Sequence, residues 1–396
     1  MSSQDERYMR MALKYAAKGL GAVEPNPAVG CLIMKANQIV GKGWHRKFGE
    51  PHAEIIALED CRNIGVKPEG ATMYVTLEPC CHEGKTGPCT KAIIEAKVKK
   101  IVAATTDPSA HADGKGFEEL RAAGIEVEVG VCEKEARVLN APFIGFASTG
   151  RPWVTLKWAQ TIDGKMAWAE KSEERRWISN ELSRKDAHGL RRRAQGILVG
   201  IDTVLADDPM LIPRPPRGRK PLRIVLDTNL RIPLTCRLLR TARHHPTLVV
   251  AGTETVAGNA EKAERIKSKG AELLCVPTSE GRCALETVVY QLGQHGVTHL
   301  LVEGGAQVIT SFLKENLADE VCVYIAPKVL GARGSKGLGE SLGDLTQSLE
   351  LKQVDIVTLG KDVRLRGLTP RAAQEIEVEV VPTETGDASD AGPEAP

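Results

Sequence analysis

The residues best suited to chemistry in this chain of 396 residues are one histidine and two cysteines in its first hundred positions. His52 and Glu54 flank an alanine, Cys80 follows a proline, and Cys89 comes nine residues after Cys80. Imidazole nitrogen and thiolate sulfur are zinc ligands, and three protein ligands leave a fourth tetrahedral position for water. Zinc lowers the pKa of such a water to about 7, and Glu54 could move its proton as a general acid and base. The spacing therefore predicts a catalytic zinc site.

The same pattern is typical of zinc-dependent deaminases, in which one histidine and two cysteines hold the metal and a glutamate stays off it. Eight residues separate Cys80 from Cys89, whereas the common deaminase signature is Cys-x-x-Cys. The longer loop disfavours a nucleobase or RNA-editing deaminase. One alternative stays open, because Cys81 and His82 could instead complete a four-ligand structural zinc site.

These residues need strands and helices to hold them, and the hydrophobic patterns predict where those lie. In the first part we expect helices near 5–18, from His52 onward, near 90–97 and near 116–123, with strands at 29–34, 39–44, 72–76, 100–104 and 125–129. In the second part we expect strands at 153–157, 197–200, 222–226, 247–251, 300–302 and 320–326, and helices at 180–194 and 306–315. The alternation of strand and helix predicts an α/β fold for both parts.

The length fits two domains, and the glycines and prolines between residues 142 and 151 mark the boundary between them. We place the domains at residues 1–147 and 148–370. Residues 371–396 carry seven acidic side chains and one arginine, and we expect them to form a disordered tail.

The composition excludes several classes of protein. No apolar run reaches the roughly 20 residues that span a bilayer, and the N-terminus lacks the apolar core of a signal peptide. Ten cysteines without a secretory leader predict a cytoplasmic protein with reduced thiols. Outside the expected tail the chain carries 52 basic and 44 acidic residues, which suits a phosphorylated small molecule better than nucleic acid. Only 4% of the residues are aromatic, which is few for stacking on RNA bases.

A second set of chemical residues lies in the other half. The strand expected at 300–302 leads through Gly304-Gly305 into a helix, and the free N–H groups at a helix start favour a phosphate. Because this is not a G-x-G-x-x-G pattern, a plain tight turn is an equal alternative. The run Arg191 to Arg193 is either a solvated helix face or a source of guanidinium groups for a phosphate.

Several longer motifs resemble one family. TLEPCCHEGKTGPC (76–89), PNPAVGCLI (25–33) and GEPHAEIIAL (49–58) are similar to the deaminase half of the bifunctional riboflavin-biosynthesis deaminase–reductase. LKWAQTIDGKMA (156–167), TVLADDPML (203–211), VEGGAQVITSFL (302–313) and YIAPKVLG (324–331) resemble its reductase half. The resemblance runs from about residue 5 to 368. It implies a cytidine-deaminase-like α/β/α sandwich followed by a dihydrofolate-reductase-like α/β domain.

The resemblance also implies a two-step reaction. The first domain would remove the 2-amino group of 2,5-diamino-6-(5-phosphoribosylamino)pyrimidin-4-one. The second would use NADPH to reduce the ribosyl side chain of the product to ribityl. The implied cofactors are one Zn²⁺ per chain and NADPH. The implied partner is a phosphorylated pyrimidine, without nucleic acid or membrane, and the expected assembly is a homo-oligomer.

The resemblance assigns roles to individual residues. Zinc would be bound by His52, Cys80 and Cys89, with Glu54 as proton carrier and Lys157 at the reduction site. The deaminase pocket would be lined by Asn26, His45, His82, Lys85 and Asp107. Substrate in the reductase would contact Arg175, Arg191, Leu211, Arg214 and Glu303. Cofactor positions fall on Ala159, Trp177, Thr203, Asp207, Thr228, Gly305, Ala306, Gln307, Val308, Ile309, Thr310 and Ser311.

Two positions depart from the family pattern. Ser109 stands where the family has asparagine, which shortens a contact in the deaminase pocket. Arg175 stands where the family has a small serine, and its long cation could add or obstruct a phosphate contact. Lys85 and Asp107 could also be ordinary solvated loop residues.

Three hypotheses for the whole chain follow. The favoured one is the bifunctional enzyme. In the second, the deaminase works while the second half has become a binding or assembly domain, a version that only Arg175 favours. In the third, the basic helix and the segment RPPRGRKPLR (214–223) bind RNA for a nucleic-acid deaminase.

Overall fold

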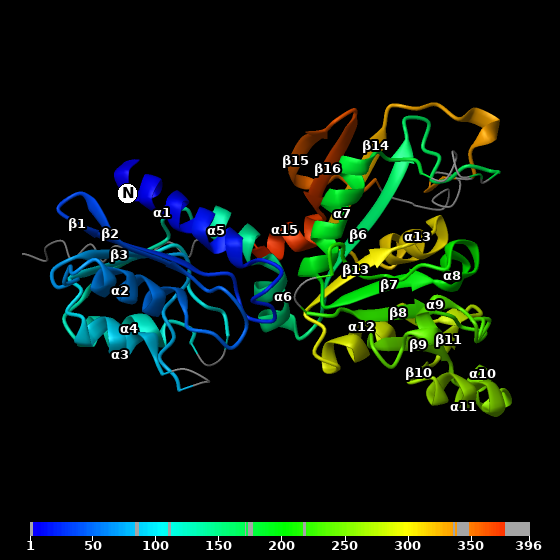
Figure 1. Cartoon of the computed structure of the whole chain (residues 1–396), viewed down its shortest axis with the longest axis horizontal. Coiled ribbons are helices and arrows are strands. Elements are labelled where there is room, and N and C mark those ends of the chain that lie inside the picture. The colour runs from blue at the N-terminus through cyan, green and yellow to red at the C-terminus, as the bar shows by residue number, and fades with distance from the viewer. Residues whose placement is uncertain are drawn as a thin grey trace, which may run out of the picture.

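The computed structural model describes residues 3–83, 87–109, 112–170, 172, 177–216, 219–335, 337–338 and 348–376. Two α/β domains lie side by side, each built on its own large sheet (Figure 1). The expected α/β architecture is therefore confirmed for both halves. Within the described ranges, no helix is both long and apolar enough to cross a membrane.

A five-stranded sheet forms the centre of the N-terminal domain. Its strands lie in the order β2 (Gln38–Trp44), β1 (Gly30–Lys35), β3 (Thr72–Val75), β4 (Lys100–Ala103) and β5 (Glu126–Val129). Strand β1 runs antiparallel to both neighbours, while β3, β4 and β5 are parallel. The expected strands and helices of this half all occur, with ends that differ by a few residues.

Helices cover both faces of this sheet because side chains alternate along each strand. Cys31 and Ile33 belong to the core beneath α2 (Ala53–Asn63), α3 (Cys89–Glu95) and α4 (Lys115–Ala122). Leu32 and Met34 belong to the core beneath α1 (Ser3–Ala16) and α5 (Glu133–Leu139) on the opposite face. The result is an α/β/α sandwich (Figure 1).

A nine-stranded sheet forms the centre of the C-terminal domain. The strand order is β10 (Glu272–Val276), β9 (Thr247–Gly252), β8 (Leu222–Leu226), β7 (Gly196–Gly200), β13 (His299–Glu303), β6 (Trp153–Thr161), β14 (Glu320–Ala326), β16 (Asp362–Leu368) and β15 (Lys352–Leu359). All neighbouring pairs are parallel except those made by β16. Parallel strands end at the same edge of a sheet, and ligands of open α/β sheets bind there.

Helices also cover both faces of the second sheet. One face packs against α7 (Glu181–Arg193), α8 (Ile201–Asp207), α9 (Arg237–Arg240) and α11 (Ala260–Ser268). The other packs against α12 (Leu285–Gln294) and α13 (Ala306–Lys314). A short α10 (Thr253–Gly258), a small hairpin of β11 (Thr278–Ser279) and β12 (Arg282–Cys283), and two 3-10 turns, η1 (Ala17–Gly19) and η2 (Gly331–Arg333), complete the described elements.

Two helices lie at the junction of the domains. The stretch read as a boundary is helical, since α6 (Ala141–Thr149) takes Pro142 into its first turn and ends at Gly150, whose φ is 67°. The predicted start of the tail at residue 371 is wrong, because α15 (Pro370–Ile376) buries Ala372 and Ile376 in a cluster with Trp153. Residues 377–396 of that tail lie outside the described residues. The domain limit at 147 stays a prediction.

Candidate active sites in the two domains

The three expected zinc ligands converge in the N-terminal domain. His52 immediately precedes α2, Cys80 lies in the loop after β3, and Cys89 is the first residue of α3. The Nδ1 atom of His52 lies 3.4 Å from the Sγ atom of Cys80 and 3.4 Å from that of Cys89, and the three atoms lie within 4.8 Å of one another. Ligands about 2.0–2.3 Å from a tetrahedral zinc ion are themselves about 3.6 Å apart. This donor set therefore fits zinc.

The alternative of a four-ligand site is not supported. Among the described residues, the group that could hold a metal contains neither Cys81 nor His82. Three ligands leave the fourth position open, as a catalytic zinc site requires. The hydrogen bond from Cys89 lowers the pKa of the Cys80 thiol to about 4, with a further contribution from His52. A thiolate, which is the form that binds metal, is thus favoured at Cys80.

The position of Glu54 depends on a close approach between α2 and strand β2. A Cβ atom at Gly43 would lie 2.2 Å from the carbonyl oxygen of Ala53, so glycine lets the first turn of α2 lie against the sheet. Glu54 in that turn is only 3% exposed. Burial raises the pKa of its carboxyl group to about 7. It is placed beside the ligands and can exchange protons near neutral pH.

His45 lies beside the ligand His52, and Asn26 contacts His45. The buried His45 ring lies 5.4 Å from the His52 ring. Its Nδ1 atom contacts the Pro51 carbonyl oxygen at 3.1 Å, and its Nε2 atom contacts the Asn26 amide nitrogen at 3.2 Å. Since a carbonyl oxygen only accepts, Nδ1 carries the proton and Nε2 accepts from Asn26. The amide oxygen of Asn26 is thereby left for a ligand.

A residue that the sequence reasoning missed holds the Asn26 loop. Asn140, buried at the start of α6, accepts a hydrogen bond from the Ala28 N–H at 2.8 Å and donates one to the Ala28 carbonyl at 3.0 Å. Asn140 is 112 residues from Ala28 in the chain, and no local pattern marks it. It is a positioning residue for the Pro-Asn-Pro turn.

Glu78 is a second missed residue, and it organises the loop that carries Asp107. Its carboxylate is 4% exposed and accepts from the backbone N–H groups of Asp107 at 3.2 Å, Gly114 at 3.0 Å and Gly116 at 2.8 Å. Asp107 in turn accepts from the Ser109 N–H at 2.9 Å, and the Ser109 side chain also forms a hydrogen bond with the Asp107 carboxyl group. The motif Thr-Leu-Glu-Pro-Cys was visible in the sequence, but the partners of its glutamate were not.

Three predicted residues of the deaminase pocket remain: Asp107, His82 and Lys85. Asp107 is half-buried, and burial raises the pKa of its carboxyl group. The charge of the exposed His82 acts in the opposite direction on that carboxyl group, which places the two side chains near each other. Lys85 lies outside the described residues.

In the C-terminal domain, Glu303, Lys157 and Arg191 meet at the edge of the sheet where the parallel strands end. Glu303 is the last residue of β13 and pairs in register with Lys157 on β6. The Arg191 Nε atom lies 3.0 and 3.1 Å from the two carboxylate oxygens of Glu303, and its Nη2 atom also bonds the carboxylate. Burial opposes the charge of Glu303, but Arg191 and Lys157 outweigh it and lower the pKa of the carboxyl group to about 2.

The pairing changes the role expected for Arg191. Its Nη1 atom donates to the Ile212 carbonyl at 3.3 Å. All three nitrogen atoms of the guanidinium therefore donate to protein oxygens. Leu211 beside it is buried, with φ at 49°, whereas Arg214 is exposed. Arg175 lies outside the described residues. His188, which the sequence reasoning missed, lies near this group, and burial followed by the charge of Arg191 lowers its pKa to about 4.

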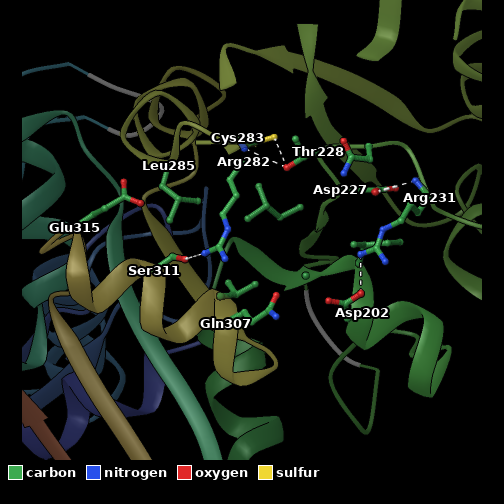
Figure 2. A pocket seen from close by; sticks show the side chains of 16 residues that line it. Asp202, Asp227, Thr228, Arg231, Arg282, Cys283, Leu285, Gln307, Ser311 and Glu315 are labelled. Carbon is green, nitrogen blue, oxygen red and sulfur yellow. Dashed lines mark hydrogen bonds and ion pairs between the residues drawn. The ribbon is translucent and has the colours of Figure 1, made fainter. Parts of the chain in front are cut away.

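A cavity of about 240 Å³ lies at the ends of β7 and β8 (Figure 2). Four of the expected cofactor residues line it: Thr228, Gln307, Val308 and Ser311. Gly305 caps α13, and Thr203 faces it, since a Cβ atom at Gly305 would lie 3.9 Å from the Thr203 hydroxyl oxygen.

Other expected cofactor residues do not line this cavity. Ile309 and Thr310 are buried on the inner side of α13, and Ala306 lies in its first turn. Ala159 is half-buried in β6 and Asp207 is exposed at the end of α8. Trp177 is 52% exposed, with the Arg184 guanidinium 5.1 Å from its ring.

Comparison with known proteins supplies the family. Residues 2–105 match the cytidine and deoxycytidylate deaminase zinc-binding region, and residues 152–365 match the RibD C-terminal domain. The riboflavin biosynthesis protein RibD of Aquifex aeolicus is 45% identical over 91% of this chain and 97% of its own length. The RibD of Escherichia coli is 38% identical over 91% of this chain and 98% of its own length. The chain belongs to the RibD family.

Solved structures of RibD proteins agree over the whole fold. RibD of Acinetobacter baumannii is 36% identical, superposes with a TM-score of 0.79, and covers 92% of this chain and 99% of its own. A deaminase/reductase of Thermotoga maritima is 34% identical, with a TM-score of 0.78 and coverage of 92% and 98%. RibD proteins are bifunctional deaminases and reductases of riboflavin biosynthesis, so the N-terminal domain is the deaminase and the C-terminal domain the reductase. Of the three hypotheses, the bifunctional enzyme is the correct one.

Proposed function

We propose that the deaminase domain binds one zinc ion through His52, Cys80 and Cys89 and acts on a phosphorylated diaminopyrimidine. The convergence of the three donor atoms beside the buried Glu54 is the observation that carries this proposal. Zinc, when bound, makes a water molecule acidic enough to attack at neutral pH. Glu54 would take a proton from that water and would deliver it to the departing amino group. The C–N bond breaks, a C=O bond replaces it, and ammonia leaves.

The substrate is proposed from the relatives and from the pocket. The Thermotoga maritima relative is described as a diaminohydroxyphosphoribosylaminopyrimidine deaminase and 5-amino-6-(5-phosphoribosylamino)uracil reductase. In this chain Asn26 has an amide oxygen free to accept from a pyrimidine N–H group, because His45 occupies its amide nitrogen. Asp107, held by Glu78, supplies a further polar contact. Lys85 is proposed to pair with the 5′-phosphate.

The reductase domain is proposed to use NADPH. NADPH, when bound, would supply the hydride for C1 of the open-chain imine form of the ribosylamine, with a proton added to the imine nitrogen. This yields the ribityl amine and NADP⁺. Lys157 and Glu303 lie side by side and are proposed to hold the ribosyl hydroxyls. Arg191 positions Glu303 through its double contact, and the exposed Arg214 takes the phosphate.

Isotope transfer tests the reductase half of this proposal. The enzyme is given the deaminated intermediate and NADPH deuterated at the transferred position, and the product is examined by mass spectrometry. Deuterium at C1 of the ribityl chain is the expected result, and an unlabelled C1 would reject the imine route.

Metal analysis tests the deaminase half. The purified chain should contain one zinc ion, and the Cys89→Ser variant should contain much less. The Cys81→Ser variant is the matched control and should keep its zinc. Full zinc content in Cys89→Ser would reject the ligand assignment.

Two further proposals concern the setting of the enzyme. None of the ten cysteines forms a disulfide among the described residues, which supports a reducing, cytoplasmic location. Val354 and Ile356 are exposed on the edge strand β15, which supports a homo-oligomer. Light scattering of the purified chain tests the second point, and a monomer at micromolar concentration would contradict it.

A further inference from the structure

The cavity at the ends of β7 and β8 contains two arginines that no sequence motif or family position assigned. Arg231 and Arg282 are the cationic residues among the 16 that line it. Figure 2 shows their guanidinium groups entering from different sides, Arg231 from the turn after β8 and Arg282 from the β11–β12 hairpin. Both are exposed to solvent. A cofactor that carries phosphate would meet them.

The strand order places this cavity at one end of the cofactor. The hydride acceptor is proposed to lie at Glu303 and Lys157, on β13 and β6. The cavity lies over Gly200 and Leu226, at the ends of β7 and β8. Strand β8 is three strand spacings from β6, or about 14 Å. A cofactor that bound with its nicotinamide at β6 and its pyrophosphate near the start of α13 would reach β7 and β8 with its adenosine half.

The two arginines differ in the protein groups that their guanidinium groups contact. The Nη2 atom of Arg231 lies 2.6 Å from the Oδ1 atom of Asp202, in an ion pair within the cavity wall. Arg282 donates from Nη1 to the Ser311 hydroxyl at 3.4 Å, a neutral partner on α13. Among the described residues, no carboxylate lies within ion-pair distance of Arg282. Of the other acids in the lining, Asp227 accepts from two backbone N–H groups, and Glu315 forms no ion pair within the described ranges. Burial raises the pKa of the Glu315 carboxyl group, and the charge of Arg282 acts on it in the opposite direction.

We propose that Arg282 binds the 2′-phosphate of NADPH and thereby selects NADPH over NADH. The adenosine ribose of NADPH carries that phosphate, and among the described residues Arg282 is the guanidinium of the cavity lining that forms no ion pair with a carboxylate. Ser311, a predicted cofactor residue, holds the guanidinium over α13 and adds a hydroxyl donor. Arg231 already forms an ion pair with Asp202, so we expect it to contribute less than Arg282 to the choice of NADPH over NADH. The inference rests on the proposed reductase function.

Cofactor kinetics of the full-length enzyme test the inference. The Arg282→Ala variant should lose roughly tenfold to a hundredfold in kcat/KM for NADPH, the range of one hydrogen bond to a charged group. Its kcat/KM for NADH should stay within twofold of the parent. The Arg282→Lys variant should recover part of the loss, and Arg231→Ala should lose less than Arg282→Ala. The matched control is Arg265→Ala, an exposed arginine on α11 outside the cavity, which should leave the NADPH value within twofold of the parent. Equal losses with both cofactors would place Arg282 on the pyrophosphate and overturn the inference, as would a loss confined to Arg231→Ala.

A binding measurement separates this inference from the reductase assignment. 2′,5′-ADP carries the 2′-phosphate without the nicotinamide, and calorimetry reports its affinity without catalysis. Binding to the parent chain that falls at least tenfold in Arg282→Ala supports the phosphate contact even if no reduction is detected. Affinity that is the same in both proteins overturns it even if reduction is normal.

Discussion

Replacing Glu78 by glutamine tests how the deaminase pocket is held. The Glu78 carboxylate offers one oxygen to the Asp107 and Gly114 N–H groups and the other to the Gly116 N–H group. An amide has a single acceptor oxygen, so the variant must turn its NH₂ group toward at least one of these N–H donors. A hydrogen bond to a charged group contributes about 1.5–3 kcal/mol, and at least one such bond is lost. We expect the deaminase domain to lose about 2 kcal/mol or more of stability.

The functional consequence should be confined to one domain. Because the carboxylate holds the backbone of Asp107, we expect deaminase kcat/KM to fall at least tenfold. NADPH oxidation on supplied intermediate should remain within twofold, since the reductase site lies on the other sheet. Ammonia release measures deaminase activity, and NADPH oxidation measures reductase activity. Stability is measured by urea unfolding, with the loss of deaminase activity as the readout.

A matched control uses the same chemical change on α4. Glu118→Gln alters an exposed side chain and should leave all three readouts unchanged. The reasoning is refuted if Glu78→Gln behaves like Glu118→Gln in stability and in deaminase kinetics.

Three further changes should give results of known direction. Asn140→Ala leaves the buried N–H and carbonyl of Ala28 without partners, so urea unfolding should show about 2–4 kcal/mol of destabilisation. The deaminase KM should rise with it, and wild-type stability and KM would contradict this role. Glu303→Gln removes the charge that Arg191 faces, so NADPH oxidation should fall roughly a hundredfold while ammonia release persists, and unimpaired oxidation would contradict the assignment. Burial lowers the pKa of His299 to about 4, whereas an unfolded histidine titrates near 6.5. The unfolded chain therefore gains a proton first as pH falls, and the reductase domain should lose roughly 3 kcal/mol between about pH 6.5 and 4. His299→Gln keeps an N–H donor for Thr155 but cannot titrate, and an unchanged pH dependence in that variant would contradict the prediction.

The zinc site could be predicted because its residues lie in short motifs. His52 and Glu54 share the start of one helix, and Cys80 and Cys89 belong to one loop and the helix after it. The residue types alone specify the metal chemistry. Most strands were also predictable, since β1 is a continuous apolar run in the sequence, as expected for a strand buried on both faces.

The supporting contacts could not be predicted because they join distant segments. Asn140 holds Ala28 across 112 residues, and Arg191 holds Glu303 across the same separation. The Arg191 guanidinium was expected on the substrate, but its geometry directs it to Glu303. The proline and glycine of α6 were interpreted as a boundary, although proline suits a first turn and glycine a helix end. Composition likewise did not reveal α15, whose apolar residues pack against Trp153, Ala141 of α6 and Leu368 of β16.

The central claim is that one chain carries two separate active sites, and the Glu54→Gln variant tests it most directly. The variant is assayed for ammonia release from the diaminopyrimidine and for NADPH oxidation with the deaminated intermediate supplied. Removing the proton carrier should reduce deamination by about a hundredfold or more. Reduction of the supplied intermediate should proceed at the parent rate. Loss of both activities, or deamination at the parent rate, would contradict the account.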